Sequence, residues 1–249
     1  MLILAILPSI ILFIIVWKGD RYEKEPPKLL IKLFLLGALT TISALIIEFL
    51  FSYVILRSMN HQGITFALIN NFLVVALAEE SGKYLVLKRV TWKHPAFNYT
   101  FDAVVYAVSV SLGFATLENV IYLIHGSVST AIGRALFSVP GHFIDALFMG
   151  YYYGFARFSD SYGDDRSKKK YLTQALGVPV LIHGFYNFCL STEYRIFILV
   201  FLVFEVLMTV LSIRRFRQLS AAEVPIPVGD SNETASSADT VIPESPTDV

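Results

Sequence analysis

The chain is poor in charge and almost without cysteine. Of its 249 residues, 16% are Asp, Glu, Lys or Arg, whereas a soluble domain carries roughly 25% charged residues. Cys189 is the only cysteine, so no disulfide can form within the chain. These shortages exclude a disulfide-stapled scaffold and argue against an ordinary soluble globular protein.

Hydrophobic residues take the place of the missing charge. They make up 55% of the chain, and the mean hydropathy is +0.61. Apolar blocks of membrane-spanning length alternate with short charged connectors, without the period-2 alternation of an outer-membrane barrel. The sequence therefore predicts an all-α fold, a polytopic transmembrane helical bundle in a lipid bilayer, and nothing in it indicates a nucleic-acid partner.

Seven apolar segments are long enough to be spans. The first is followed by "WKGDRYEKEPPK" rather than by a signal-peptide cleavage site, so we expect it to remain as a helix. "GYYYG" at 150–154 has the small-xxx-small spacing of a helix contact. The predicted segments are 1–17, 29–52, 65–87, 99–125, 132–156, 172–191 and 194–213.

The distribution of basic residues predicts the orientation. If the N-terminus lies outside, the cytoplasmic connectors hold sixteen of the 20 Lys and Arg residues, and the outer side holds only Arg57, Arg134 and Arg195. Lys83 is the remaining one, inside a span. Because cytoplasmic connectors are enriched in Lys and Arg, we expect the N-terminus outside and the C-terminus in the cytoplasm.

The end of the chain differs from the rest in composition. From Gln218 on there is no Lys or Arg, whereas Pro, Ser, Thr and acidic residues are frequent. Such a segment cannot bury enough apolar surface to fold. We therefore expect two parts, a transmembrane domain over 1–217 and a disordered acidic cytoplasmic tail over 218–249.

Ionisable residues inside the spans are the most informative feature. Each costs roughly 2.5–3.5 kcal/mol at the bilayer centre, yet four predicted helices carry them. Glu79 and Lys83 stand at i, i+4 and lie on one helix face. The set expected to converge on one polar cavity is Glu79, Glu80, Lys83, Glu118, His142, His183 and Asn187.

Each member has a plain packing interpretation when it is taken alone. A Glu–Lys pair can be an internal ion pair, and a membrane-embedded His can be a packing hydrogen bond. Glu48 and Glu205 have no polar companion on their helix stripe and are expected to serve packing, and Asp102 is expected to be solvated near an interface. The set as a whole argues for a site, because scattering these groups in lipid would cost far more than gathering them.

The chemistry of this set is that of water activation. Two adjacent carboxylates beside one ammonium separate into an acid and a base. The histidines could donate hydrogen bonds to an oxyanion, with Asn187 orienting His183 or joining them. Alternatively, His142, His183 and Glu118 could form a zinc site that leaves Glu79 or Glu80 as base. No HExxH motif gives the zinc site independent support, and no GxSxG motif is present.

Five short stretches carry a resemblance to a known family. They are "DRYEKEP", "EESGK", "FATLEN", "PGHFIDALFMG" and "HGFYN", in that order. Together they resemble the PrsW family of intramembrane proteases over about residues 8–190, and beyond it the superfamily of CAAX prenyl endopeptidases and bacteriocin-immunity proteins. The resemblance implies a protease of the bacterial cell membrane that cuts a single-pass anti-sigma factor on its extracytoplasmic side.

The resemblance also assigns residues. Glu79 and Glu80 match the paired catalytic glutamates, and the remaining acidic and imidazole positions fall on Glu118, His142 and His183. Asn187 falls where the superfamily has Asn or Asp. Lys83 stands one residue before the Arg of the prenyl endopeptidases' EExxxR motif, and this departure favours the PrsW branch. Zinc is an option that the resemblance leaves open.

Two other classes of function compete with a protease. Membrane-embedded Glu, His and Lys also build the proton relays of proton- or ion-coupled transporters. Transporters commonly contain inverted repeats and broken helices, and we find neither pattern in this sequence. The third class is a non-enzymatic immunity or scaffold protein that keeps the polar cluster for packing.

Overall fold

The computed structural model describes residues 2–56, 63–124, 126–192, 194–221 and 223–227. Within these ranges the fold is all-helical, and the only strand-like feature is an isolated bridge between Tyr99 and Pro225. The elements are α1 (Leu2–Gly19), α2 (Pro27–Leu56), α3 (Ile64–Leu68), the π-helical η1 (Ile69–Ala76), α4 (Leu77–Thr91), α5 (Asp102–Ile124), α6 (Val128–Gly133), the π-helical η2 (Arg134–Ser138), α7 (Val139–Ser161), α8 (Asp165–Ser191) and α9 (Ile196–Ala221).

Within the described residues, each predicted segment overlaps a helix for most of its length. α3, η1 and α4 form one continuous stretch, and so do α6, η2 and α7. Among the described residues, five stretches are long and apolar enough to cross a membrane: Leu2–Gly19, Pro27–Phe51, Ile64–Thr91, Asp102–Ile124 and Ile196–Ala221. α7 and α8 fall short because they carry interior polar residues such as His142 and His183. The all-α class is confirmed, whereas a count of seven crossings stays a prediction.

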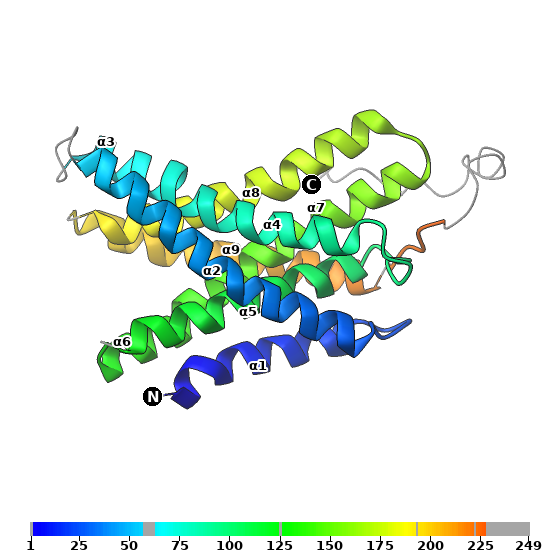
Figure 1. The fold of residues 1–249 in the computed structure, drawn as a ribbon, viewed down its shortest axis with the longest axis horizontal. Helices are drawn as coiled ribbons and strands as arrows, with labels where there is room; N and C mark the ends of the chain where they lie inside the picture. Colours follow the sequence, from blue (N-terminus) through cyan, green and yellow to red (C-terminus); the bar gives the residue numbers. More distant parts are fainter. Residues whose placement is uncertain (1, 57–62, 125, 193, 222, 228–249) are drawn as a thin grey trace.

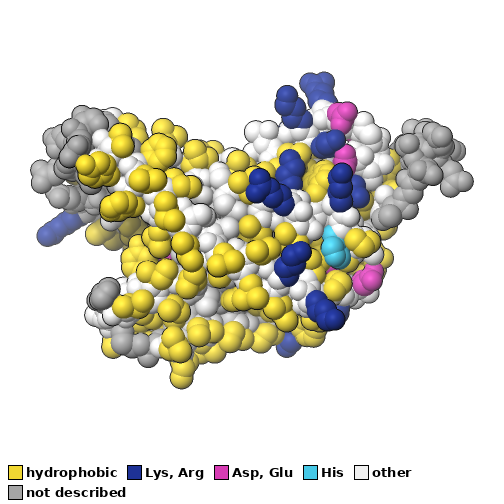
Figure 2. All heavy atoms as spheres, viewed as in Figure 1, with side chains coloured by type: hydrophobic (Ala, Val, Ile, Leu, Met, Phe, Trp, Pro, Cys, Tyr) yellow, Lys and Arg dark blue, Asp and Glu magenta, His cyan; other side chains and the backbone are white. Residues whose placement is uncertain are grey.

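α5 is the centre of the bundle (Figure 1). Its residues from Asp102 to Ala115 are all buried, because α1, α2, α4 and α7 pack around it. In contrast, α2 and α9 expose large apolar side chains, for example Phe49 at 72% and Val203 at 62%. Apolar side chains cover much of the face shown in Figure 2, as expected of a surface in contact with lipid.

Connectors alternate between the two ends of the bundle. The connectors 20–26, 92–101 and 162–164 lie together at the right in Figure 1, and the N-terminus and the start of α6 lie at the left. Lys and Arg side chains gather over the right part of the face in Figure 2. This alternation agrees with the predicted topology, and which end is cytoplasmic stays a prediction.

The chain remains ordered beyond the predicted start of the tail. α9 runs past Gln218 to Ala221, and the following segment lies against the connector before α5. The amide of Thr100 donates to the carbonyl of Val224 at 3.0 Å, and that of Ile226 donates to the carbonyl of Asn98 at 2.6 Å. α9 and this paired segment therefore extend past the predicted boundary at 218. The division into a transmembrane domain and a disordered tail stays a prediction, and 228–249 lie outside the described residues.

Asp102 is fully buried rather than solvated. Its Oδ2 atom accepts hydrogen bonds from the amides of Asn98 at 3.0 Å and Tyr99 at 2.7 Å. The expectation of an exposed side chain is wrong because the connector 92–101 and the segment after α9 fold over the start of α5, and composition alone does not reveal that cover.

Glycines permit the closest helix contacts. A Cβ atom on Gly37 would lie 2.0 Å from the carbonyl oxygen of Val110, where α2 crosses α5. The predicted contact through "GYYYG" is confirmed, since a Cβ on Gly150 would lie 2.5 Å from the Cα of Val104. Backbone is the obstacle at both positions, so no side-chain movement relieves it.

We expect Gly37→Ala to destabilise the protein by about 1–3 kcal/mol, because the added methyl forces α2 away from α5. This should lower Tm by several degrees in detergent-solubilised protein. Gly177→Ala is the matched control, because a Cβ there meets nothing within 4 Å and alanine favours the helix. Equal Tm values for the two variants would contradict the described crossing.

Candidate active site

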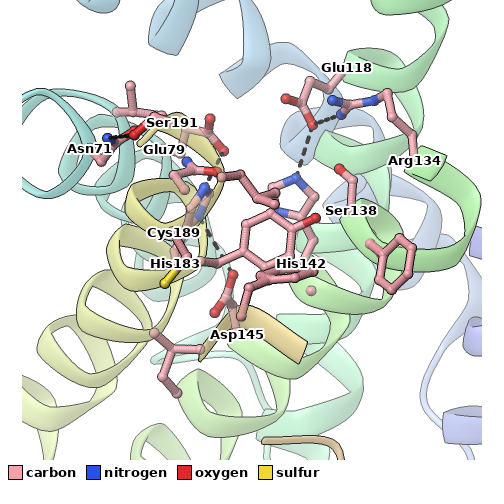
Figure 3. A pocket seen from close by; sticks show the side chains of 18 of the residues that line it. Asn71, Glu79, Glu118, Arg134, Ser138, His142, Asp145, His183, Cys189 and Ser191 are labelled. Carbon is pink, nitrogen blue, oxygen red and sulfur yellow. Dashed lines mark hydrogen bonds and ion pairs between the residues drawn. The ribbon is translucent and has the colours of Figure 1, made fainter. Parts of the chain in front are cut away.

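The four helical stretches predicted to carry the site bring their polar residues to one place (Figure 3). α4 supplies Glu79, Glu80 and Lys83, and α5 supplies Glu118. His142 comes from α7 and His183 from α8, and their ring centroids lie 5.3 Å apart. The predicted convergence is therefore present in the structure.

Lys83 is the cationic centre of the group. Its Nζ atom donates to Glu80 Oε1 at 2.7 Å and lies 3.5 Å from Glu79 Oε2. The same atom contacts His142 Nδ1 at 3.1 Å, and it lies over the ring of Phe114 at 4.1 Å. One ammonium thus offsets the charge of two buried carboxylates and joins α4 to α7.

Glu80 holds the His183 ring in a defined orientation. His183 Nδ1 lies 2.8 Å from Glu80 Oε1 and 3.5 Å from Asp145 Oδ2. Because a carboxylate only accepts, this nitrogen carries the proton. The other ring nitrogen, His183 Nε2, lies 3.8 Å from Glu79 Oε2.

Glu118 holds the second imidazole in a similar way. Its Oε2 atom accepts from His142 Nε2 at 2.9 Å and from Arg134 Nη2 at 2.6 Å. Arg134 also donates to Asn119 Oδ1 at 2.7 Å, and its guanidinium stacks over the ring of Tyr122. Two carboxylates, Glu118 and Glu80, therefore each fix one histidine.

Arg134 is the residue of this network that the sequence analysis misses. It is counted there only as an outer basic residue. A signal was available, because Arg134, Ser138 and His142 follow one another at i, i+4 and i+8, the spacing of one helix face. The structure places Arg134 at the start of η2, directly before α7.

A cavity of about 860 Å³ opens beside the group. Glu79, Glu118, His142 and His183 lie on its wall, whereas Glu80 and Lys83 are not part of the lining. The sequence does not show which of the two adjacent glutamates faces the cavity, whereas the structure shows that Glu79 does and Glu80 does not. Ser191 and Thr192 at the end of α8 also line the cavity, which places it toward the predicted outer end of the bundle.

Three further polar residues line the same cavity. Glu48 and Glu205, expected to serve packing, both contribute to its wall. That expectation is corrected. The spacing of polar residues along one helix does not show which polar side chains a neighbouring helix places beside it. Asn187 lies on the wall as well, and its contribution to orienting His183 or an oxyanion stays a prediction.

The described residues include a group of donors suited to a metal ion. Glu79, Glu80, His142 and His183 each offer a ligand atom, and these atoms lie within 4.8 Å of one another. Glu79 Oε2 and Glu80 Oε2 are buried and accept no hydrogen bond. Glu118, the predicted third ligand, is not in this group, because its carboxylate binds Arg134 and His142.

Comparison with known proteins decides the family. The sequence profile described as "PrsW family intramembrane metalloprotease" matches residues 25–213, which is most of the chain. The chain belongs to the PrsW family. The structure thus describes a membrane-embedded hydrolase, and the transporter alternative is not favoured.

Curated relatives agree with this assignment. Protease PrsW of Bacillus subtilis is 37% identical over 202 residues, 80% of this chain and 88% of the relative. Protease PrsW of Oceanobacillus iheyensis is 36% identical over 214 residues, 86% of this chain and 93% of the relative. Protease PrsW of Clostridioides difficile is 33% identical over 210 residues, 83% and 85% of the two chains. No solved structure matches the chain.

We expect Lys83→Met to lower the free energy of unfolding by about 3–5 kcal/mol, because it leaves buried carboxylates without their cation. Adding Glu80→Gln should recover a large part of this loss, since it removes the charge that Lys83 pairs with. Thermal unfolding of Lys83→Met, Glu80→Gln and the double variant at neutral pH measures the coupling. If the double variant is as unstable as the sum of the two single variants, Lys83 and Glu80 do not act as a pair.

Proposed function

We propose that this PrsW-family chain hydrolyses a peptide bond of a membrane-embedded protein substrate with water activated by Glu79. The observation that carries this proposal is the asymmetry between the two adjacent glutamates. Glu79 lies on the cavity wall with a carboxylate oxygen that accepts no hydrogen bond. Glu80 is fully buried and is engaged by Lys83 and His183.

The space between Glu79 and His183 suits a water molecule. The 3.8 Å between Glu79 Oε2 and His183 Nε2 is too long for a direct hydrogen bond, and a single water can contact both groups. Glu79 would take a proton from this water as its oxygen attacks the substrate carbonyl. His183 Nε2 accepts the second hydrogen bond of the same water and so orients it.

Other residues of the group support this step. We assign to Asn187, one helix turn beyond His183 on the cavity wall, a hydrogen bond to the oxyanion that forms on the carbonyl oxygen. The pair of Arg134 and Glu118 fixes the His142 ring through Nε2. Lys83 keeps Glu80 ionised and thereby keeps the Nδ1 proton of His183 in place.

The family's description implies a metal ion, and the residues fit one. Two imidazoles and a carboxylate are a common donor set of catalytic zinc. Glu118 and Glu80 occupy His142 Nε2 and His183 Nδ1, as outer carboxylates do at metal sites. His183 Nε2 and Glu79 would therefore hold the ion in place of their direct hydrogen bonds to the water, and His142 Nδ1 would join them by exchanging its contact with the Lys83 ammonium for the ion. When bound, zinc would polarise the water and the substrate carbonyl. One oxygen of Glu79 would remain to accept the proton.

For the substrate we propose a single-pass anti-sigma factor in the bacterial cell membrane, cut on the extracytoplasmic side. Three observations support this: the resemblance to PrsW, the bacterial relatives, and a cavity at the predicted outer end. The wider likeness to CAAX prenyl endopeptidases stays a prediction.

We expect Glu79→Gln to reduce cleavage of a reconstituted single-pass substrate by about 10²–10⁴-fold without lowering Tm. Glu205→Gln, which removes another carboxylate of the cavity wall, should keep most of the activity. The assay is appearance of the cut fragment on a gel. Full turnover by Glu79→Gln would reject Glu79 as the base.

For the metal, we expect a strong chelator to abolish cleavage and added Zn²⁺ to restore it, because the donor set is that of a zinc site. Elemental analysis should find zinc in wild-type protein and little in the His142→Ala/His183→Ala double variant. Cleavage that persists in protein shown to be free of metal would remove the ion from the mechanism and leave Glu79 as the sole activator of water.

A further inference from the structure

A second group of buried acids lies at the opposite end of the bundle from the cavity. Asp20 follows α1, Asp102 begins α5 and Glu223 follows α9, and each offers a carboxylate oxygen within 4.8 Å of the other two. Asp20 and Asp102 are 0% exposed and Glu223 is 7% exposed. Three chain segments far apart in sequence thus direct carboxylates to one point.

These carboxylates are poorly satisfied. Neither oxygen of Asp20 nor of Glu223 accepts a hydrogen bond of normal geometry, and only Oδ2 of Asp102 accepts one. The ammonium of Lys24 donates to the backbone carbonyls of Trp17 and Asp20 rather than to these carboxylates, and its charge offsets only part of the effect of burial, which raises the pKa of Asp20. A fully buried aspartate with two unpaired oxygens is costly, so the structure calls for a positive charge between these side chains.

The surroundings increase the negative charge. Glu25 is buried at 2% exposure nearby and accepts a hydrogen bond from the hydroxyl of Tyr106. Burial, with a contribution from Asp20 and Asp102, raises the pKa of Glu223 to about 7, and the amides of Arg21 and Tyr22 offset only part of this effect. A cation bound between these side chains would offset this crowding of carboxylates.

We propose that Asp20, Asp102 and Glu223 form a binding site for a hard divalent cation of the Mg²⁺ or Ca²⁺ class. Ligands that are oxygen atoms only, with no His or Cys, suit these ions rather than zinc. The bound ion ties the segment after α9 to the α1–α2 connector and to α5. Ser220 Oγ donates to the carbonyl of Gly19 at 2.6 Å, so the end of α9 already contacts the end of α1 next to this site.

The site is separate from the catalytic group. Asp102 and Glu118 lie at opposite ends of α5, 16 residues apart in sequence, which corresponds to about 24 Å along a helix. The ion therefore acts on stability, and its removal and the removal of an active-site metal are distinguishable.

The test is thermal unfolding of the full-length protein, purified in detergent, stripped with chelator and titrated with CaCl₂ or MgCl₂. At a 100-fold excess over Kd, one of the two salts should raise Tm by about 5–10 °C. Asp20→Asn and Glu223→Gln should each lose most of that shift. Which salt acts identifies the ion.

Three controls separate this site from other acids. Asp165→Asn, an exposed acid at the same end of the bundle, and Glu244→Gln in the acidic terminus should keep the full shift. Glu79→Gln should keep it too, because the catalytic group is not involved. If Asp20→Asn does not fold, Glu223→Gln decides alone. No Tm shift of the wild type with either salt, or an undiminished shift in Glu223→Gln, would overturn the proposal.

Discussion

The ion pair between Lys83 and Glu80 is the interaction on which the rest of the site depends. Its 2.7 Å contact lies among fully buried atoms, where an unpaired charge would be expelled or neutralised. At an effective dielectric constant of 20, two charges 4 Å apart attract by about 4 kcal/mol. Because the pair keeps Glu80 ionised, Glu80 can hold His183, and Glu79 keeps on the cavity wall an oxygen that accepts no hydrogen bond. The pairing of Glu80 with Lys83 and His183 thus decides which of the two glutamates can act on a water molecule.

A π-helical segment directly precedes both α4 and α7. η1 ends three residues before Glu79, and η2 ends four residues before His142. π-helical turns are rare and are frequent at functional sites, since an extra residue in a turn changes the direction of all side chains beyond it. In this protein they lie directly before the residues of α4 and α7 that face one another, and η2 carries Arg134, which donates to Glu118.

Sequence reasoning reached the convergence of the polar residues because a single physical rule, the cost of charge in lipid, applies to every member. It identified Glu79, His142 and His183 together for that reason. It could not tell Glu79 from Glu80, because that difference depends on which side of α4 the cavity lies. It missed the burial of Asp102, because a connector and the chain beyond α9 cover it. Glu48 and Glu205 were misjudged since neighbouring helices, not their own, supply their polar surroundings.

The central claim is that the charged groups share a water-filled cavity inside the bilayer, and the reactivity of a cysteine in that cavity tests it most directly. In a chain with Cys189→Ser, Ser138→Cys lies on the cavity wall, whereas Leu73→Cys lies on the exposed apolar surface at 64% exposure. A membrane-impermeant thiol reagent applied to both faces of the membrane should label the cysteine at 138 and not the one at 73. Labelling of 73 with protection of 138 would contradict the account.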